Sequence, residues 1–368
     1  YIIRMVKVAL VHDYLNQFGG AERVLFVLAE MFPEAPIYTL FYEPSVFDGH
    51  FREGTIKTSF LDHSMVRRRH RFFIPLFPKA AENLNLGDNY DLIISNSSGF
   101  AKGINYKGGV HLSYIHTPLR YAWEPETWLG TLLPKVVIKL SSPIISYLRR
   151  WDRRAGKKPD FIITLSTHIA KKIKEAYGRE AEIIYPPVDT TVFYPDYSVP
   201  KQDYFLAFGR LIHNKRFDLV IKAFNELQFP LKIVGSGPHE AKLKKLARSN
   251  NIEFLARISD DELREVITGA KAFIFPQVED FGLVAAEALA CGTPVIAYRA
   301  GGALDIIEED ANGLFFDEQT PNSLIEAINR FNKMKFDQSK IVQSAQKFSQ
   351  ELFKQNLTKT INQALQLY

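Results

Sequence analysis

Short apolar runs alternate with amphipathic stretches of helical period along almost the whole chain, and this alternation begins twice. The runs are VKVALVH (6–12), DLIISNS (91–97), VHLSYIHT (110–117) and FIITLS (161–166), then YFLAFG (204–209), LKIVG (231–235), IEFLA (252–256), AFIFP (272–276) and PVIAY (294–298). Buried strands that lead into helices are typical of parallel sheets with helices on each face. The sequence therefore predicts an α/β fold with two doubly wound sheets.

A proline-rich linker separates the two sets of runs. The segment YPPVDTTVFYPDYSVPKQD, residues 185–203, contains four prolines and cannot form long regular structure. A chain of 368 residues also exceeds what one hydrophobic core normally serves. We therefore expect one domain at 1–195 and a second at 196–349. The last helical stretch, about 350–368, has no strand of its own and is predicted to pack back onto the first domain.

The excess of positive over negative charge is confined to the first half of the chain. Residues 1–195 carry 25 Lys and Arg against 19 Asp and Glu, a net charge of +6, whereas residues 196–368 carry 21 against 22, or −1. No nucleic-acid-binding motif accompanies this excess, so we expect no nucleic acid partner. An anionic lipid surface or a phosphate-bearing acceptor explains the charge better.

Two further features indicate where the protein works. The single cysteine, Cys291, excludes an internal disulfide and fits a reducing cytoplasm. The longest apolar stretch, 132–148, is interrupted by prolines and lysines and does not predict a transmembrane helix. We expect a cytoplasmic protein that binds peripherally to the inner face of the cell membrane.

A basic and aromatic segment is the candidate membrane surface. In MVRRRHRFFIPLF, residues 65–77, four arginines precede two phenylalanines: Arg67, Arg68, Arg69, Arg71, Phe72 and Phe73. Cations attract anionic head groups, and aromatic rings enter the membrane interface. The same pattern would suit a core-packing loop with solvated arginines, so both interpretations stay open.

Two glutamates in the second half are the first candidates for ligand binding. Glu279 follows the run AFIFP, and Glu287 lies eight residues later in a stretch of helix-forming composition. Open parallel sheets bind ligands at the carboxyl ends of their strands, where Glu279 is predicted to lie. The helix start at Phe281, Gly282 and Leu283 would offer unpaired amides to sugar or phosphate oxygens. Two glutamates at this spacing could equally mark a solvated helix face.

Two cations and a glycine turn stand at the ends of neighbouring strands. Arg210 and Lys215, in GRLIHNK, follow the run YFLAFG and could hold a diphosphate. Gly235 and Gly237, in GSGP, follow the next run and predict a turn that faces a phosphate or ribose. GSGP is not a GxGxxG fingerprint, because Glu240 stands where the third glycine would be, so no nicotinamide or flavin cofactor is expected.

The first half offers three further candidates. Gly19 and Gly20, in FGGAER, stand where the chain enters its first predicted helix, so a ligand could approach their backbone closely. His116 lies just past a predicted strand, in the run VHLSYIH, at the expected edge of a cleft, where a catalytic role and a structural hydrogen bond are equally plausible. The nine histidines show no metal-binding spacing, and we assign no metal.

Together these motifs resemble one family. Residues 278–302, with GRLIHNK, IVGSGP, FGGAER and YIHTPLRY, are similar to the retaining glycosyltransferases of family 4, and most similar to the bacterial mannosyltransferases that build O-antigen and exopolysaccharide units. The resemblance covers nearly the whole chain. It implies the GT-B fold, with two facing Rossmann-like domains, the acceptor in the first, the donor in the second and an interdomain cleft between them.

The resemblance also implies roles for the candidates in the second domain. Glu287 would bind the ribose hydroxyls, and Glu279 would contact the donor sugar. Arg210 and Lys215 would hold the diphosphate and stabilise the charge that develops on it as the anomeric bond breaks. Glu279 is not expected to act as a nucleophile, because the family's retaining step is widely regarded as same-face attack assisted by the leaving phosphate.

In the first domain, the resemblance implies that Gly20 offers its amide to the phosphate and that His116 lies near the sugar. The expected reaction needs no metal or other cofactor. It moves a hexose, with mannose from GDP-mannose favoured, to a lipid-linked or growing saccharide in cell-surface polysaccharide synthesis. The partners are thus a nucleotide sugar, a saccharide acceptor and an anionic membrane surface.

The sequence departs from the family pattern in two places. Ala256 stands where a glycine is common beside the nucleotide base, and Ala285 and Ala286 stand where a proline often precedes the second glutamate. The first departure leaves UDP-sugars open as donors. Two different activities would also fit these motifs: a sugar-nucleotide epimerase with the same fold, and a non-catalytic subunit that binds sugar nucleotides.

Overall fold

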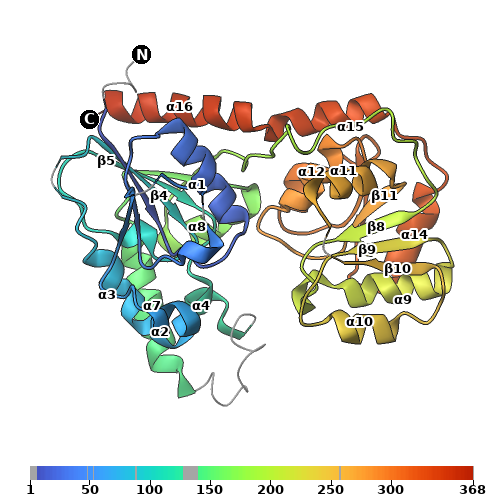
Figure 1. Cartoon of the computed structure of the whole chain (residues 1–368), viewed down its shortest axis with the longest axis horizontal. Coiled ribbons are helices and arrows are strands. Elements are labelled where there is room, and N and C mark those ends of the chain that lie inside the picture. The colour runs from blue at the N-terminus through green and yellow to red at the C-terminus, as the bar shows by residue number, and fades with distance from the viewer. Residues whose placement is uncertain are drawn as a thin grey trace. The chain divides into compact units, whose positions relative to one another are not determined.

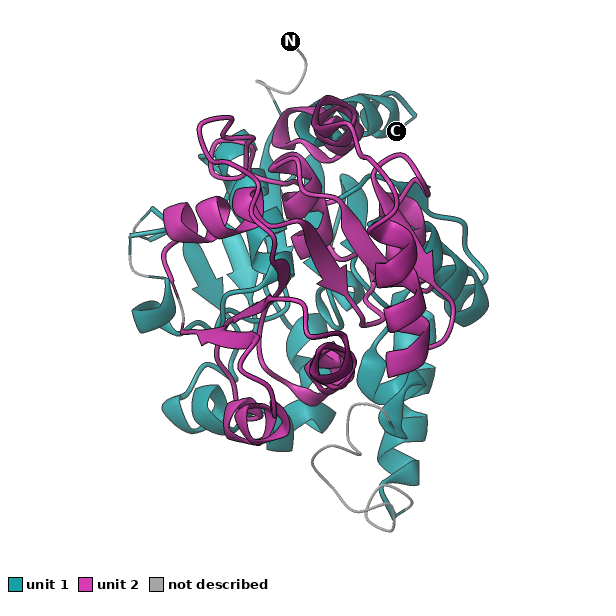
Figure 2. Cartoon of the chain, turned by 90° about the vertical axis from the view of Figure 1, so that its right-hand side faces the viewer, with its two compact units in different colours: residues 1–185, 353–368 teal, residues 186–352 magenta. Residues whose placement is uncertain are grey.

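The computed structural model describes residues 6–47, 49–52, 54–87, 89–126, 140–256 and 258–367. The chain forms two compact units (Figures 1 and 2): unit 1 comprises Tyr1–Tyr185 and Phe353–Tyr368, and unit 2 comprises Pro186–Leu352. The predicted boundary at residue 195 therefore falls inside unit 2. The chain joins unit 2 earlier because Val188 forms a parallel bridge with Ser349. Of the apolar stretch 132–148, residues 132–139 lie outside the described part.

Unit 1 contains a seven-stranded sheet in the order β3-β2-β1-β4-β5-β6-β7, with every pairing parallel. The strands are β1 (Val8–His12), β2 (Ile37–Thr39), β3 (Ile56–Thr58), β4 (Leu92–Ser97), β5 (Val110–Ile115), β6 (Phe161–Thr164) and β7 (Glu182–Ile183). Residues of β1, β4 and β5 are buried throughout, which explains why these strands read as apolar runs. The short strands β2, β3 and β7 gave no such signal.

Helices complete unit 1 around this sheet (Figure 1). They are α1 (Gly20–Met31), α2 (Ser64–Arg69), α3 (Phe77–Glu82), α4 (Arg120–Trp123), α7 (Ser142–Ala155) and α8 (Thr167–Tyr177), with the 3₁₀ segments η2 (Pro44–Val46), η3 (His70–Leu76) and η4 (Ala101–Gly103). The sheet reverses its strand order between β1 and β4. Side chains that follow these strands at their carboxyl ends are therefore placed at a topological switch point, where open α/β sheets bind ligands.

Unit 2 contains a six-stranded parallel sheet in the order β10-β9-β8-β11-β12-β13. Its strands are β8 (Phe205–Phe208), β9 (Leu231–Val234), β10 (Ile252–Leu255), β11 (Ala272–Phe275), β12 (Val295–Tyr298) and β13 (Gly313–Phe316). Its helical segments are η5 (His213–Lys215), α9 (Phe217–Leu227), α10 (Glu240–Leu246), α11 (Asp260–Gly269), α12 (Leu283–Ala290), α13 (Ala303–Ile306), α14 (Pro321–Phe331), α15 (Gln338–Ala345) and η6 (Gln346–Phe348). The prediction of two doubly wound α/β domains is confirmed.

The C-terminal helix α16 (Gln350–Gln366) contributes to unit 1 from Phe353 onward. The Phe353 ring packs edge-on against Tyr114 of β5, with 5.9 Å between the ring centroids. Lys354 forms an ion pair with Glu30 of α1 at 2.9 Å, and the Thr360 hydroxyl donates to Glu182 at 3.0 Å. These contacts hold the end of the chain against unit 1. In Figure 1, α16 runs along the upper edge of this unit.

Candidate functional site

The loop between β11 and α12 carries Glu279 and is held by close backbone contacts. The Gly302 amide donates to the Glu279 carbonyl at 2.9 Å. Gly282, the residue before α12, has a φ of +109°, and a β-carbon there would lie 2.7 Å from Cζ of Phe275. This left-handed conformation favours glycine, and the chain can therefore turn tightly from β11 into α12.

A cation from another strand end reaches Glu279. The Lys215 ammonium group contacts Oε1 of Glu279, and the Gln277 side-chain amide donates to the same oxygen at 2.8 Å. Lys215 follows β8 and Glu279 follows β11, and these strands are neighbours where the sheet order reverses. Arg210 also follows β8; it is exposed, and its guanidinium group has no hydrogen-bond or ion-pair partner within the described ranges. The structure thus brings Lys215 and Glu279 together and leaves Arg210 open to an anion.

Glu287 lies in α12 and is only 1% exposed. Five other residues of this helix are buried as well, so Glu287 does not lie on a solvated helix face. Phe281 is buried against Phe348, with 5.4 Å between the ring centroids, and Leu283, half-buried, begins α12. The interpretation of Glu287 as part of a solvated face is therefore wrong, because α12 is enclosed by its own unit.

Gly235 and Gly237, in the loop after β9, have a clear packing role. A β-carbon at Gly235 would lie 2.0 Å from the Gly209 carbonyl oxygen, and one at Gly237 would lie 2.4 Å from the Leu211 carbonyl oxygen. The loops after β8 and β9 thus approach each other through their backbones. Both glycines lie beside the segment that carries Arg210, and their contact with a ligand remains a prediction.

In unit 1, Gly19 and Gly20 lie at the start of α1. Gly19 precedes the helix, and a β-carbon there would lie 3.1 Å from Oε2 of Glu22. A β-carbon at Gly20 would meet no atom within 4 Å. Neither residue has a positive φ. The packing of unit 1 therefore does not require glycine at position 20, and the space beside its backbone is open to a ligand.

His116 follows β5 and is buried. Its Nε2 bonds to the side-chain oxygen of Asn96, and its backbone amide donates to Ser97 at 2.8 Å. Burial first, and the nearby His12 and Arg120 second, lower the pKa of His116 to about 3. The imidazole is therefore neutral at pH 7, and its position is compatible with a catalytic role as well as with a structural hydrogen bond.

The structure adds polar residues that we did not single out from the sequence. His12, Asp13, Glu22 and Asn96 are all buried. Asp13 accepts hydrogen bonds of 2.6 Å from the amides of Ser98, Phe100 and Ala101 and so holds the loop after β4. The available signal was a polar side chain at the end of an otherwise apolar run, in VKVALVHD and DLIISN.

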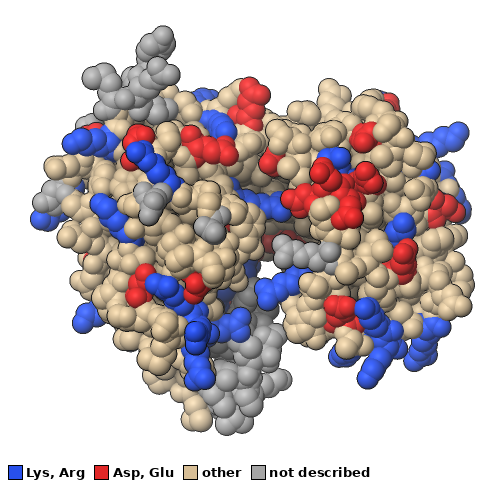
Figure 3. Space-filling model, viewed as in Figure 1, with Lys and Arg blue, Asp and Glu red and all other residues tan. Residues whose placement is uncertain are grey.

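The basic segment after β3 divides into packed and exposed residues. Arg67 is bonded to Asp62 at 2.6 Å, and Phe73 packs against the core of unit 1, so these two do not form a free surface. Arg68, Arg69 and Arg71 are exposed, and Phe72 is 82% exposed. The candidate membrane surface is therefore reduced to these four residues, which lie in α2 and η3. Lys and Arg side chains gather near the end of unit 1 that carries α2 (Figure 3).

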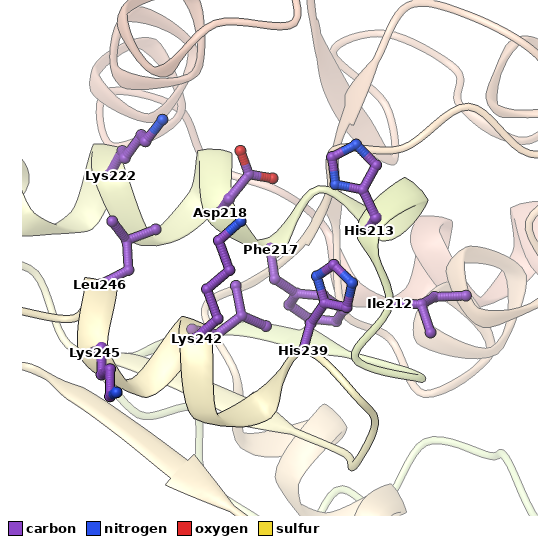
Figure 4. Close-up of a pocket in the computed structure, with 10 residues that line it drawn as sticks. Ile212, His213, Phe217, Asp218, Lys222, His239, Lys242, Lys245 and Leu246 are labelled. Carbon is purple, nitrogen blue, oxygen red and sulfur yellow. The ribbon is translucent and has the colours of Figure 1, made fainter. Parts of the chain in front are cut away.

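A cavity of about 320 Å³ lies beside η5, α9 and α10. Figure 4 shows apolar, basic and acidic side chains interspersed around it, and the lining comprises Ile212, His213, Phe217, Asp218, Lys222, His239, Lys242, Leu243, Lys245 and Leu246. No residue predicted for the site lines this cavity. The cavity is therefore adjacent in the chain to Arg210 and Lys215, although neither residue lines it.

Two kinds of feature are absent from the described residues. They contain no group of three or more His, Cys, Asp or Glu side chains arranged to hold a metal ion. Within the same ranges, no helix combines the length and apolar character that crossing a membrane requires.

Comparisons with known proteins place the chain in a family. Residues 18–192 match the model of Glycosyltransferase Family 4, and residues 196–348 match that of Glycosyl transferases group 1. An uncharacterised glycosyltransferase of Methanocaldococcus jannaschii is 30% identical over 251 residues, which are 63% of this chain and 68% of that protein. The chain belongs to the glycosyltransferases.

Another relative matches a shorter part of this glycosyltransferase, and two solved structures match nearly all of it. The GDP-mannose-dependent α-(1-6)-phosphatidylinositol monomannoside mannosyltransferase of Mycobacterium tuberculosis is 28% identical over 205 residues, 48% of this chain and 53% of that enzyme. Among solved structures, Anabaena HepE in complex with UDP has a TM-score of 0.69 at 20% identity, covering 97% and 100% of the two chains. Thermosynechococcus elongatus sucrose-phosphate synthase has a TM-score of 0.68 at 17% identity, covering 99% and 100%. The two Rossmann-like domains of this glycosyltransferase thus have the GT-B architecture.

Proposed function

We propose that this glycosyltransferase moves a hexose from a nucleotide sugar to a saccharide acceptor, without a metal and with retention of anomeric configuration. The observation that carries the proposal is the contact between Lys215 and Glu279 at the switch point of unit 2, where Arg210 also follows β8. A diphosphate bound there would face two cations, and the sugar would face a carboxylate. This is the arrangement that a nucleotide-sugar donor needs.

The two cations supply the main chemical assistance. Breaking the anomeric bond places negative charge on the departing diphosphate, and fixed cations stabilise that charge more in the transition state than in the ground state. Lys215 already contacts Glu279, and Glu279 is therefore assigned to orient the sugar and Lys215 rather than to attack as a nucleophile. Glu287, a buried residue of α12, is assigned to the ribose hydroxyls. In unit 1, Gly20 is assigned to the phosphate and His116 to the sugar.

GDP-mannose is the donor that we favour. The mycobacterial relative is a GDP-mannose-dependent mannosyltransferase, and it matches about half of this chain. UDP-sugars are the second candidates, since HepE was solved with UDP and Ala256 replaces a glycine that is common beside the base. The acceptor that we propose is a lipid-linked or growing saccharide of O-antigen or exopolysaccharide synthesis. Arg68, Arg69, Arg71 and Phe72 would hold unit 1 on the inner face of the membrane.

Release of the nucleotide diphosphate from a panel of GDP- and UDP-sugars tests this proposal. We expect GDP release from GDP-mannose, faster with a lipid-linked saccharide present and unchanged by EDTA. Arg210→Ala should abolish most of this turnover, whereas Arg248→Ala, at an exposed arginine after α10, should not. Conversion of the donor sugar without nucleotide release would identify an epimerase instead, and turnover of no nucleotide sugar by the folded protein would reject the proposal.

A further inference from the structure

One asparagine in unit 1 connects the start of α1 with His116. Asn96 lies in β4 and is completely buried. Its side-chain nitrogen donates to the Ala21 carbonyl oxygen at 2.7 Å and lies 3.2 Å from Nδ1 of His12. Its side-chain oxygen lies within hydrogen-bond distance of Nε2 of His116. One amide group therefore satisfies three partners from three parts of the sequence.

The Ala21 carbonyl fixes the direction of these hydrogen bonds. A carbonyl oxygen can only accept, so the NH₂ group of Asn96 must face Ala21 and its oxygen must face His116. That oxygen is also only an acceptor, so Nε2 of His116 must carry the hydrogen. In a neutral imidazole the other nitrogen then holds the lone pair. Nδ1 of His116 is therefore a hydrogen-bond acceptor.

The same reasoning extends to the far side of Asn96. Its second N–H points to Nδ1 of His12, which must be unprotonated to accept it. The hydrogen of His12 then lies on Nε2, 3.4 Å from Oε1 of Glu22. The donors run in one direction, from His116 through Asn96 and His12 to the Glu22 carboxylate. This series of hydrogen bonds ends on the Glu22 carboxylate. The direction of donation cannot reverse unless the hydrogen bond between Asn96 and Ala21 breaks.

Nδ1 of His116 is available to a ligand. It makes no hydrogen bond within the described residues, and His116 as a whole is 7% exposed. Nδ1 of His111, in β5, is by contrast buried with no partner. Burial also keeps His116 neutral, since its pKa is lowered to about 3.

We propose that Asn96 is a positioning residue that holds His116 as the Nε2–H tautomer, so that Nδ1 accepts a hydrogen bond from a hydroxyl group of the donor sugar. This inference rests on the proposed function for the identity of the ligand. It assigns His116 to the sugar and not to the diphosphate, because phosphate oxygens only accept hydrogen bonds. Asn96 also holds the first turn of α1, so one side chain sets both His116 and the backbone beside Gly20.

Nitrogen chemical shifts test the tautomer without any ligand. The full chain would be labelled with ¹⁵N-histidine and the ring signals assigned with single His→Gln variants. At pH 7 we expect His116 to show a protonated Nε2 and an unprotonated Nδ1. A protonated Nδ1 or a charged ring would overturn the proposal, whatever reaction the enzyme catalyses. This measurement on the unaltered protein needs no variant to fold.

The Asn96→Asp variant tests the role of the amide. A carboxylate cannot donate to Ala21 or to His12, so the His12 and His116 signals should change, while those of His111, bonded to Ser95, should stay the same. We expect kcat to fall by about tenfold, the size of one neutral hydrogen bond, with KM nearly unchanged. Unchanged His116 signals and kcat in the folded variant would also overturn the proposal. If the unaltered enzyme shows the expected tautomer but turns over no nucleotide sugar, this would contradict the proposed function alone.

Discussion

The ammonium group of Lys215 contacts the carboxylate of Glu279, although 64 residues separate them in the chain. The pair forms because β8 and β11 are adjacent strands of the unit 2 sheet and both residues follow their carboxyl ends. The side chains are 23% and 22% exposed, so water and a ligand can both reach them. Lys215 is thus already oriented by a counter-charge and needs little reorganisation to meet a diphosphate.

Replacing Lys215 with alanine should lower kcat by about 100- to 1,000-fold, as for a lost charge-stabilising donor in other enzymes. The expected reason is that the departing diphosphate loses one of its two cations. Steady-state kinetics with the active nucleotide sugar measure this effect. Lys244→Ala is the matched control, because Lys244 forms an exposed ion pair with Glu240 in α10. Equal kinetics for both variants would contradict the role of Lys215.

Two glycine variants should separate activity from stability. Gly20→Ala meets no atom within 4 Å in unit 1, so its melting temperature should stay the same, while a methyl group beside the phosphate should lower kcat/KM by about 100-fold. Gly282→Ala should lose about 2 kcal/mol of unfolding free energy, because φ is +109° and the β-carbon would press on Phe275. Urea unfolding and kinetics on both variants test this contrast. A fully active Gly20→Ala enzyme would remove Gly20 from the site.

The architecture could be predicted from the sequence because strands buried on both faces read as uninterrupted apolar runs. The strands β1, β4, β5, β6 and β8 to β12 follow from such runs. The short strands β2, β3 and β7 were missed because three residues such as Ile37–Thr39 carry too little pattern, and β13 was missed because GLFF follows a turn rather than a long run. The boundary was placed late because the bridge between Val188 and Ser349 is a long-range contact.

The site could be predicted only in part. Arg210, Lys215 and Glu279 were selected as candidates because each follows an apolar run, yet no pattern revealed that Lys215 and Glu279 touch. The network around Asn96 was not predicted, since it depends on which strands are neighbours. Arg67 and Phe73 were assigned to the surface because composition cannot distinguish an arginine paired with Asp62, or a phenylalanine packed on the core, from exposed neighbours of the same type.

Two buried histidines should make unit 1 sensitive to acid. Burial lowers the pKa of both His111 and His116 to about 3, from the ordinary value of 6.5. The unfolded chain therefore binds protons first as the pH falls, and stability that is present above pH 6.5 is lost progressively towards pH 3. At pH 5 each histidine should reduce the unfolding free energy by about 2 kcal/mol. Urea unfolding at pH 7.5 and pH 5 measures the loss, which His111→Gln should diminish. A pH-independent midpoint would contradict this expectation.

The exposed part of the basic segment should bind anionic membranes. Changing Arg68, Arg69 and Arg71 to serine should weaken binding by about 1 kcal/mol for each arginine near the surface. Sedimentation with vesicles containing phosphatidylglycerol measures the effect, which should shrink at high salt. Arg67→Ser is a useful comparison, because Arg67 is bonded to Asp62 and should contribute less. Undiminished binding by the triple variant would place the membrane contact elsewhere or exclude it.

The buried ion pair between Lys102 and Asp152 should be essential for the stability of unit 1. Both side chains are 0% exposed, and 2.7 Å separates Nζ of Lys102 from Oδ1 of Asp152. Lys102→Met would leave the Asp152 charge buried without its cation, which should cost about 3–5 kcal/mol of unfolding free energy. Lys174→Met is the control, since the Lys174–Glu180 pair is largely exposed and its loss should leave the urea midpoint unchanged. Asp152 also accepts hydrogen bonds from Trp123 and Tyr177, so the substitution should also destabilise the segment after His116. Equal midpoints for the two variants would show that the buried pair contributes no more than an exposed one.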